Sequence, residues 1–373
     1  MDIPRHPVIG GKLFDQGMYG CMFAPALHCK YKKKLVLDDT KPEGTKPEDN
    51  VNYPITKIIL KEDAEMEYSI GSMIRRIPLW KNYFSVSESI CLPSPAQTDK
   101  DLSYCKPLEG HEIEEFRILS MTYSGLPLSI YRFQMKGFDF MSFVMHLLEA
   151  GALMTLYGLV HRDLHKGNIL VDQYNVPRII DFNLSIVVKS DITDNTLAHS
   201  YNPIISQLSP DYVLVNAANT LKRKASGVFQ SNKSLSNRVI DATIDKKPIM
   251  KKVSAILGIP MSEMRQQLYQ FYIKSKSVQS GNLADWFHVY WRVVDSWAIG
   301  INIIELISNF SQWREFGPIY AQHRDILLPM LRRLCAVDPT QRIDCVQAIY
   351  YLDPTNFIIR KYGEAWMKKV GTL

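Results

Sequence analysis

Two aspartates, Asp163 and Asp181, lie eighteen positions apart in the stretch GLVHRDLHKGNILVDQYNVPRIIDFNLSIVV, and both are next to apolar runs that should be buried. Asn168 lies between them. Chemistry on a phosphate group can use this set, because one carboxylate can accept a proton from a hydroxyl while a second carboxylate and an amide oxygen hold Mg²⁺. We therefore predict Asp163 as the proton acceptor and Asn168 and Asp181 as the ligands of Mg²⁺.

The elements around these residues must hold them in place. Helical periodicity over Phe140 to Tyr157 predicts a helix that ends just before HRDLHKGN. Two short apolar runs, ILV and RII, then predict two strands that lead to DFN, residues 181 to 183. The strands would bring the two acids to one end of a small sheet.

The stretch resembles the eukaryotic-type protein kinase family, whose catalytic loop reads H-R-D-L-x-x-x-N and whose metal motif reads D-F-G. Only the last glycine differs, and Asn183 takes its place. The resemblance implies a bilobal fold that binds ATP and Mg²⁺. It also implies that Asp163 is the proton acceptor and that Asn168 and Asp181 are the Mg²⁺ ligands, as predicted above. In the family, a lysine two positions after the catalytic aspartate steadies the transferred phosphate. Here His165 has that position and Lys166 follows, so either residue could supply the charge.

A kinase also needs a glycine-rich hairpin over the phosphates, where a Cβ would be in the way. The segment LFDQGMYGCMF, Leu13 to Phe23, fits this pattern at Gly17 and Gly20.

The next strand should carry a lysine that pairs with a helix glutamate and meets the α- and β-phosphates. ITKIIL supplies Lys57 and the following helical segment supplies Glu67, with Lys61 and Glu65 as the rival choices.

The segment RILSMTYSGLPL resembles the fifth strand and the hinge of the family, where backbone groups receive the adenine edge. The resemblance places Met121 behind the adenine and Thr122, Tyr123 and Ser124 in the hinge.

Two further motifs bear on the substrate class. The segment from Ser209 to Asp211 resembles the A-P-E motif, and Arg342, in the family's D-P-x-x-R setting, is its expected ion-pair partner. Asp295 begins a D-x-W-x-x-G helix and is expected to bond the backbone of the catalytic loop. Small-molecule kinases of the aminoglycoside and choline type lack both motifs, so the resemblance implies a protein substrate.

The order of elements predicts an α+β protein. Short strands fill the first hundred residues, together with one helix over Ala64 to Arg76, and helical periodicity follows. We predict a β-rich N-lobe at residues 1–123 and a helical C-lobe at 124–373, with an insertion at about 214–285. Further helices are expected at Trp286 to Asn309, Gln322 to Ala336 and Asp344 to Leu352.

The insertion carries most of the positive charge. The chain has a net charge of +6, while Asn216 to Ser280 alone holds twelve Lys or Arg against three acidic residues. This composition is typical of a mobile, solvated segment, although the apolar spacing of Ile249 to Ile273 would allow one or two extra helices. The basic charge could bind an acidic protein, nucleic acid or membrane lipids, and a solvated segment without a partner is the alternative.

Six cysteines at irregular spacings, with no C-x-x-C pair, favour reduced thiols over a disulfide framework or a zinc site. The start of the chain has no secretory signal pattern, and the apolar runs are interrupted by polar residues. We therefore predict no transmembrane segment and a cytoplasmic location.

Three segments resemble more narrowly the divergent kinases of large nucleocytoplasmic DNA viruses: GMYGCMFAPALHC, AEMEYSIGSMI and WFHVYWRVVDSWAIG. This resemblance implies a viral protein that acts in the host cytoplasm, with packaging in virions as a further expectation. The sequence as a whole predicts an ATP-dependent serine/threonine protein kinase. The alternatives are a catalytically silent pseudokinase scaffold and a small-molecule phosphotransferase.

Overall fold

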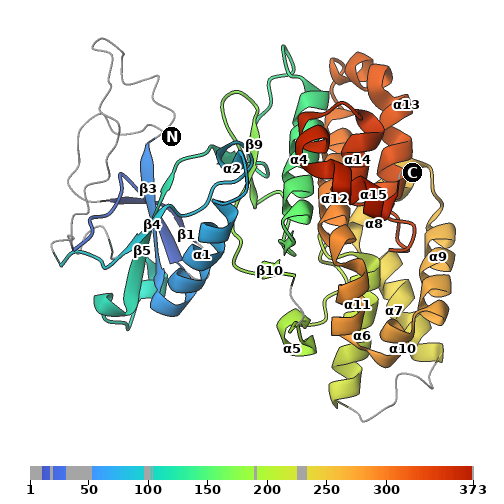
Figure 1. Cartoon of the computed structure of the whole chain (residues 1–373), viewed down its shortest axis with the longest axis horizontal. Helices are drawn as coiled ribbons and strands as arrows, with labels where there is room; N and C mark the ends of the chain where they lie inside the picture. The colour runs from blue at the N-terminus through green and yellow to red at the C-terminus, as the bar shows by residue number, and fades with distance from the viewer. Residues whose placement is uncertain are drawn as a thin grey trace. The chain divides into compact units, whose positions relative to one another are not determined.

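The structure is a computed structural model, and it describes residues 11–16, 20–30, 53–95, 102, 104–188, 191–224 and 233–371. The chain forms two compact units. The N-terminal unit runs to Leu126 and also takes in Ile180–Asn183, and the C-terminal unit consists of Pro127–Ile179 and Leu184–Leu373. An antiparallel sheet dominates the first unit and helices dominate the second (Figure 1), as the sequence predicts for an α+β chain.

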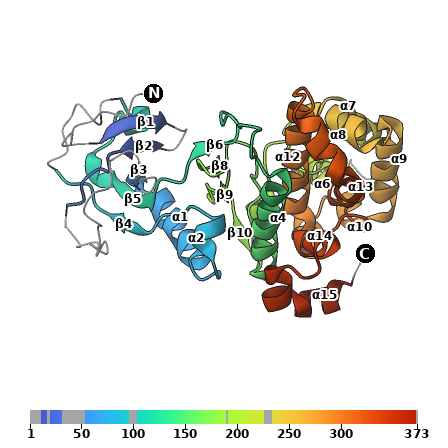
Figure 2. The same ribbon diagram turned by 90° about the horizontal axis from the view of Figure 1, so that it is seen from above.

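The N-terminal unit is built on a five-stranded sheet with the strand order β1-β2-β3-β5-β4 (Figure 2). Helix α1 packs on one face of this sheet, where Ala64 contacts Ile59 and Leu119. The elements of the unit are β1 (Lys12–Gln16), β2 (Gly20–Ala24), β3 (Pro54–Leu60), α1 (Lys61–Ile74), α2 (Trp80–Tyr83), β4 (Ser89–Cys91), η2 (Lys106–Leu108), η3 (Ile113–Glu115) and β5 (Phe116–Thr122).

Strand β3 is the central strand and has a core on both of its faces. Its side chains alternate, so Ile58 packs into a cluster with Phe23 and Ile118, while Ile59 packs against α1. Lys57 is two residues before Ile59, so its side chain points to the same face of the sheet, the one covered by α1. This alternation brings the strand lysine to the helix.

The C-terminal unit is centred on the buried helix α12, which packs against α4, α13 and α8 (Figure 1). Gly151 of α4 lies at a close approach between these helices, because a Cβ there would lie 2.4 Å from Ile299 Cδ1 and 2.6 Å from Cys345 Sγ. Short strand pairs carry the loops beside these helices: β7 (Leu159–Val160) pairs with β10 (Ile186–Val187), and β8 (Ile169–Val171) pairs with β9 (Pro177–Ile179). The helices are α4 (Phe140–Leu156), α5 (Asp194–Leu197), α6 (Pro210–Lys224), α7 (Lys233–Asp245), α8 (Pro248–Leu257), α9 (Met261–Lys274), α10 (Lys276–Ser280), α11 (Leu283–Tyr290), η4 (Trp291–Val293), α12 (Val294–Phe310), α13 (Phe316–Leu334), α14 (Cys345–Leu352), the π-helical turn η5 (Ile359–Gly363) and α15 (Glu364–Val370); the two-residue strand β6 (Leu126–Pro127) lies at the junction of the units.

Most predicted helices are present, with two differences. The helix expected over Trp286 to Asn309 is divided, since the 3-10 turn η4 separates α11 from α12. The basic insertion is helical in its described part rather than solvated. Its apolar residues at helical spacing, Val253 and Leu257 of α8 and Leu268 of α9 among them, are buried.

One helical run in the described part of the chain, Leu283–Phe310, is long and apolar enough to cross a membrane by length and composition alone. No such run was expected from the sequence. Of its apolar window, 78% is buried inside the protein, and a core helix meets the same criterion.

The prediction of reduced cysteines is wrong for four of the six. Cys21 of β2 is bonded to Cys105, and Cys29 is bonded to Cys91 of β4, with Cα atoms 5.9 and 5.7 Å apart. Folding joins residues 84 and 62 positions apart in the sequence, so their spacing gives no signal. Cys335 and Cys345 are free and buried.

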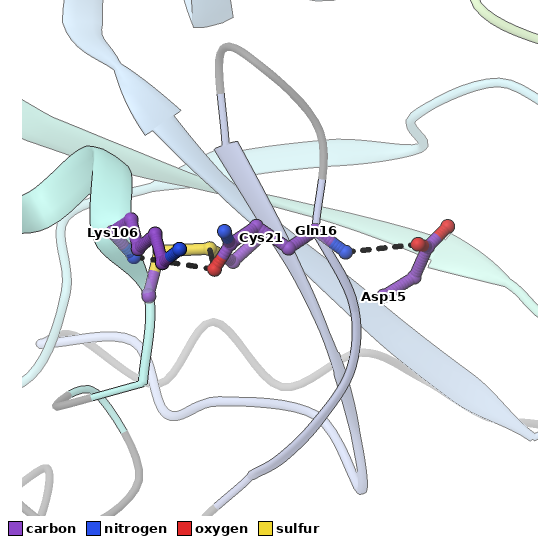
Figure 3. Close-up of a disulfide and its surroundings, with 5 residues drawn as sticks. Asp15, Gln16, Cys21 and Lys106 are labelled. Atoms are coloured by element: carbon purple, nitrogen blue, oxygen red, sulfur yellow. Dashed lines mark hydrogen bonds between the residues drawn. A yellow bond between two sulfur atoms is a disulfide. The ribbon is translucent and has the colours of Figure 1, made fainter.

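Figure 3 shows the first of these disulfides beside the β1–β2 hairpin. The Gln16 side chain lies next to it, and its Oε1 accepts a hydrogen bond from the Lys106 amide at 3.2 Å. The start of η2 is thus fixed to both strands of the hairpin.

We expect chemical mapping to find the two disulfides. Alkylation of the unfolded, unreduced protein should modify Cys335 and Cys345 only, and reduction should then expose the other four cysteines. Reduction should also destabilise the N-terminal unit by about 2–4 kcal/mol per bridge, because each disulfide restricts the unfolded chain. A variant with serine at all four bridged positions is the control, and its thermal melting should not respond to reductant. Alkylation of Cys21 or Cys91 before reduction would contradict the assignment.

Candidate functional site

The N-terminal unit holds a buried ion pair between β3 and α1. Lys57 Nζ lies 2.6 Å from Glu67 Oε2. Ala64 anchors α1 on the sheet, and Glu67, three residues later, lies on the same face of the helix and is therefore directed at the strand. Of the two pairings that the sequence allowed, the structure forms Lys57 with Glu67. Lys61 and Glu65 are exposed.

The charge of Lys57 is maintained by its neighbours. Burial acts to lower the pKa of the ammonium, but the negative charges of Glu67, Asp181 and Asp63 outweigh burial and raise it. Lys57 is therefore a fixed cation with three acidic residues of the same unit close enough to act on it. This is the arrangement that a phosphate-binding lysine needs.

Asp181 belongs to the N-terminal unit by its contacts, and Asp163 belongs to the C-terminal unit. Phe182 is buried and meets the ring of Phe84 edge to face, with centroids 5.8 Å apart. Asp181 itself is exposed and has φ +60°, a left-handed conformation that few non-glycine residues adopt. The buried Phe182 anchors the segment, so the strained residue beside it is fixed with its carboxylate open to solvent.

The candidate hairpin is described only in part, since Gly17 lies outside the described residues. Gly20 begins β2 and pairs with Ile59 of β3. A Cβ at Gly20 would lie 2.0 Å from Ile59 Cγ2 and 2.3 Å from the Ile58 carbonyl oxygen. The close approach of β3 therefore requires glycine at this position, whether or not a nucleotide binds beside it.

The expected hinge segment lies at the end of β5. Met121 pairs with Ile55 in the sheet and packs beside the cluster of Ile59, Ala64 and Leu119. The Tyr123 amide donates to the Tyr53 carbonyl at 3.0 Å, and the two tyrosine rings stack with centroids 4.8 Å apart. The N–H of Tyr123 is therefore engaged and cannot also bind an adenine.

The C-terminal unit fixes the loop of Asp163 through a buried carboxylate on α12. Asp295 Oδ2 accepts the His161 amide at 2.6 Å and Oδ1 accepts the Arg162 amide at 2.9 Å. Burial raises the pKa of Asp295, while His161, Arg162 and these two amides act to lower it. The predicted bond from Asp295 to the backbone of this loop is confirmed.

Two further contacts restrain the same loop. Seven residues after Asp295, and therefore about two helical turns along α12, Asn302 Nδ2 donates to the Leu164 carbonyl at 3.1 Å. Arg162 has φ +69°, and its buried guanidinium donates to the Leu197 carbonyl at 2.6 Å and the Thr196 carbonyl at 3.2 Å. The backbone on both sides of Asp163 is held by other elements, so its position does not depend on its own side chain.

The Asp163 carboxylate has an amide donor at each oxygen. Gln207 Nε2 donates to Oδ1 at 2.8 Å, and Asn168 Nδ2 donates to Oδ2 at 3.3 Å and to the Asp163 carbonyl at 2.9 Å. The carboxylate is therefore oriented and remains partly exposed. A carboxylate of this kind can accept a proton from a substrate hydroxyl.

Of the two residues that could replace the missing lysine, His165 is the one that faces Asp163. His165 Nε2 lies 3.8 Å from Asp163 Oδ2, and Nδ1 accepts the Gly167 amide at 2.9 Å. In the neutral ring, the proton is then on Nε2, on the side of Asp163. Lys166 is exposed, and no hydrogen bond or ion pair joins it to Asp163 within the described ranges.

The predicted magnesium ligands have the chemistry that the ion requires. Because Nδ2 of Asn168 makes both hydrogen bonds described above, Oδ1 is left as an acceptor. Asp181 offers an exposed carboxylate, and Mg²⁺ prefers such oxygen ligands. Among the described residues, no group of three or more His, Cys, Asp or Glu forms an all-protein metal site.

The predicted ion pair of Asp211 and Arg342 is present and fully buried. Arg342 donates to Asp211 Oδ1 at 2.7 Å, and both side chains are 0% exposed. Arg342 also donates to the Ala336 carbonyl at 2.8 Å, and its guanidinium lies 5.5 Å from the ring centroid of Trp297. The pair ties the start of α6 to the segment before α14.

Two residues near Asp163 were missed by the sequence. Gln207 lies just before the A-P-E-like motif, and nothing in its type marks it as a contact of Asp163. Lys247, in KKPIMKK, was counted with the solvated positive charge, yet it is fully buried. Its Nζ donates to the carbonyls of Ile205 and Leu208, the latter at 3.0 Å. The only signal was the apolar spacing that follows it, which predicts a buried helix at α8.

Comparison with known proteins finds no family model that matches the chain and no curated protein with significant similarity to it. The functional assignment therefore depends on the motifs and on the geometry of these two groups of residues.

Loss of one partner from the Asp211–Arg342 pair should destabilise the C-terminal unit. Arg342→Leu leaves the Asp211 carboxylate buried without its partner, and we expect a loss of about 3–5 kcal/mol in the free energy of unfolding, measured with urea. The double variant Asp211→Leu, Arg342→Leu should lose less than the sum of the two single variants, because it removes both charges. A loss below about 1 kcal/mol in Arg342→Leu would contradict the structural role.

The burial of Lys247 should appear in the pH dependence of stability. Burial lowers its pKa from 10.5 to about 7. Between these values the unfolded chain binds more protons than the folded chain, so the contribution of this residue to stability rises with pH and is lost as pH falls toward 7. The difference in unfolding free energy between wild type and Lys247→Met should change by on the order of 1 kcal/mol per pH unit between pH 7 and 10. Lys246→Met, at an exposed neighbour, should follow the wild type, and parallel curves for Lys247→Met would contradict the burial.

Proposed function

We propose that this chain is a bilobal protein kinase that transfers the γ-phosphate of ATP to serine or threonine hydroxyls of proteins. The observation that carries the proposal is the arrangement of Asp163. Hydrogen bonds orient its carboxylate, which is partly exposed, and buried Asp295 restrains the backbone just before it. The motif HRDLHKGN alone could be a loop held by polar caps. A carboxylate whose two oxygens are each held by an amide, on a loop fixed by buried Asp295, is the arrangement expected of a proton acceptor.

In the proposed reaction, the substrate hydroxyl oxygen bonds to the γ-phosphorus while the bond from that phosphorus to the bridging oxygen of ADP breaks. Asp163 accepts the hydroxyl proton. Lys57, held by Glu67, supplies a fixed positive charge for the α- and β-phosphates. Mg²⁺, when bound, would be held by Asn168 and Asp181 and would neutralise charge on the phosphates.

His165 is proposed to stand in for the family lysine by donating from Nε2 toward the transferred phosphate. It lies closer to Asp163 than the exposed Lys166, and its Nδ1 is already used by Gly167. A neutral imidazole donates a hydrogen bond without a full charge, so His165 would hold a phosphate more weakly than the family lysine does.

A protein substrate is supported by the buried pair of Asp211 and Arg342. This pair stabilises the segment before α6, which the resemblance assigns to substrate docking, and small-molecule kinases of the aminoglycoside and choline type lack it. We extend the proposal to a viral kinase of the host cytoplasm on the narrower resemblance alone.

Phosphate transfer can be tested directly with purified protein, radiolabelled ATP, Mg²⁺ and a generic basic protein. Wild type should label the substrate or itself, and Asp163→Asn should lower the rate by about 10²–10⁴-fold, because the proton acceptor is lost. Lys57→Met should also lower the rate, while Asp325→Asn, at an exposed aspartate of α13, should not change it.

The same product separates the rival functions. Phosphoamino-acid analysis should give phosphoserine or phosphothreonine, and dominant phosphotyrosine would overturn the substrate class. ATP binding without transfer to any protein would instead support a silent scaffold. Transfer to a small hydroxyl compound but not to protein would support a metabolite kinase.

A further inference from the structure

The segment from Ile205 to Leu208 takes its shape from side chains of other elements. It lies outside helices and strands, yet three of its four carbonyls have side-chain donors. Lys247 Nζ donates to the carbonyls of Ile205 and Leu208, and Trp297 Nε1 donates to the Ser206 carbonyl at 3.0 Å. Two elements far apart in the sequence therefore hold four consecutive residues.

The remaining residue of this segment, Gln207, is the one whose side chain reaches Asp163. Its Nε2 lies 2.8 Å from Oδ1, which is closer than Asn168 Nδ2 lies to Oδ2, at 3.3 Å. Because the backbone on either side of Gln207 is held, its amide is presented to Asp163 from a fixed base. Rotation of the carboxylate would break one or both of these bonds.

Lys247 itself is held by the insertion. It immediately precedes α8, whose first turn begins with Pro248. Helix α8 packs against α12, and its buried residues include Ile249 and Val253. Within the described part of the chain no carboxylate bonds to Lys247, so its hydrogen bonds are to the two carbonyls. A buried ammonium without an acidic partner is costly, and these two bonds offset part of that cost.

We infer that Gln207 is a positioning residue for the Asp163 carboxylate, and that Lys247 of the insertion and Trp297 of α12 position Gln207 by holding the main chain around it. This inference rests on the proposed function, because orientation of Asp163 matters only if Asp163 accepts the proton. The insertion then contributes to the rate of transfer from within the C-terminal unit, without an acidic partner or nucleic acid.

The inference is tested by kinetics on Gln207→Leu, which keeps the bulk of the side chain and removes the amide. We expect kcat to fall about tenfold, since a loosened catalytic group loses orientation. The Kd for a fluorescent ATP analogue and the thermal melting temperature should stay at the wild-type values. Gln207→Glu, which has the same shape but places a second carboxylate beside Asp163, should lose at least as much.

Epistasis distinguishes positioning from a structural effect. In an Asp163→Asn background, Gln207→Leu should cause no further loss, because the group it orients is already gone. Lys247→Met should lower kcat, and adding it to Gln207→Leu should have little further effect, since both act through one contact. Lys246→Met, at the exposed neighbour, is the matched control and should leave kcat unchanged.

The outcomes separate the inference from the proposed function. Full activity of Gln207→Leu in an active wild-type background would overturn the inference alone. If Gln207→Leu lowers kcat by the same factor in the wild-type and the Asp163→Asn backgrounds, the inference is also overturned, because the effect would then not pass through Asp163. An inactive wild type would overturn both. If Lys247→Met fails to fold, the Gln207→Leu and Gln207→Glu variants still decide the matter.

Discussion

A buried carboxylate on α12 determines where the Asp163 loop lies. Asp295 accepts two consecutive backbone amides, those of His161 and Arg162, so a single side chain satisfies two buried donors and fixes two peptide planes. Both planes immediately precede Asp163. The burial of Asp295 makes an unpaired carboxylate expensive, and the contact is therefore kept as long as the unit is folded. The position of the Asp163 loop is thus fixed by the buried Asp295 rather than by exposed side chains of the candidate site.

The same helix also organises the segment on the other side of Asp163. Trp297, two residues after Asp295, donates to the Ser206 carbonyl, and the guanidinium of Arg342 lies over the Trp297 ring while it pairs with Asp211. Five residues after Trp297, Asn302 reaches the Leu164 carbonyl. Asp295, Trp297 and Asn302 of this one helix therefore reach two loops that are far apart in the sequence. Their hydrogen bonds are shielded from water, so each is expected to be stronger than at the surface.

The contacts that the sequence could predict depend on regular spacing within one helix or strand, or on a position within a motif. The pairing of Lys57 with Glu67 depends on strand alternation and on helix spacing from Ala64, and both are periodic features of the sequence. Asp295 and Arg342 lie at fixed positions in recognisable motifs. The disulfides and the contact of Gln207 with Asp163 depend instead on segments far apart in the sequence that meet only after folding, so residue type and spacing carry no signal for them. The expected cytoplasmic location is based on the missing secretory signal pattern, and the two disulfides do not favour it, because disulfides are uncommon in cytosolic proteins.

The insertion shows why net charge is a poor guide to the role of a segment. Its twelve Lys and Arg suggested a solvated segment, which could either bind an acidic partner or have no partner. Charge counts treat every lysine alike, but Lys246 is exposed and Lys247 is fully buried. The difference arises from position: Lys247 immediately precedes a helix whose apolar face must pack on α12, so its side chain is carried inward with that face. Once buried, an ammonium must find acceptors, and the irregular segment 205–208 has carbonyls that need donors. Lys247 therefore donates to the carbonyls of Ile205 and Leu208. Through these bonds, helix α8, which carries Lys247 inward, is coupled to the backbone that carries Gln207.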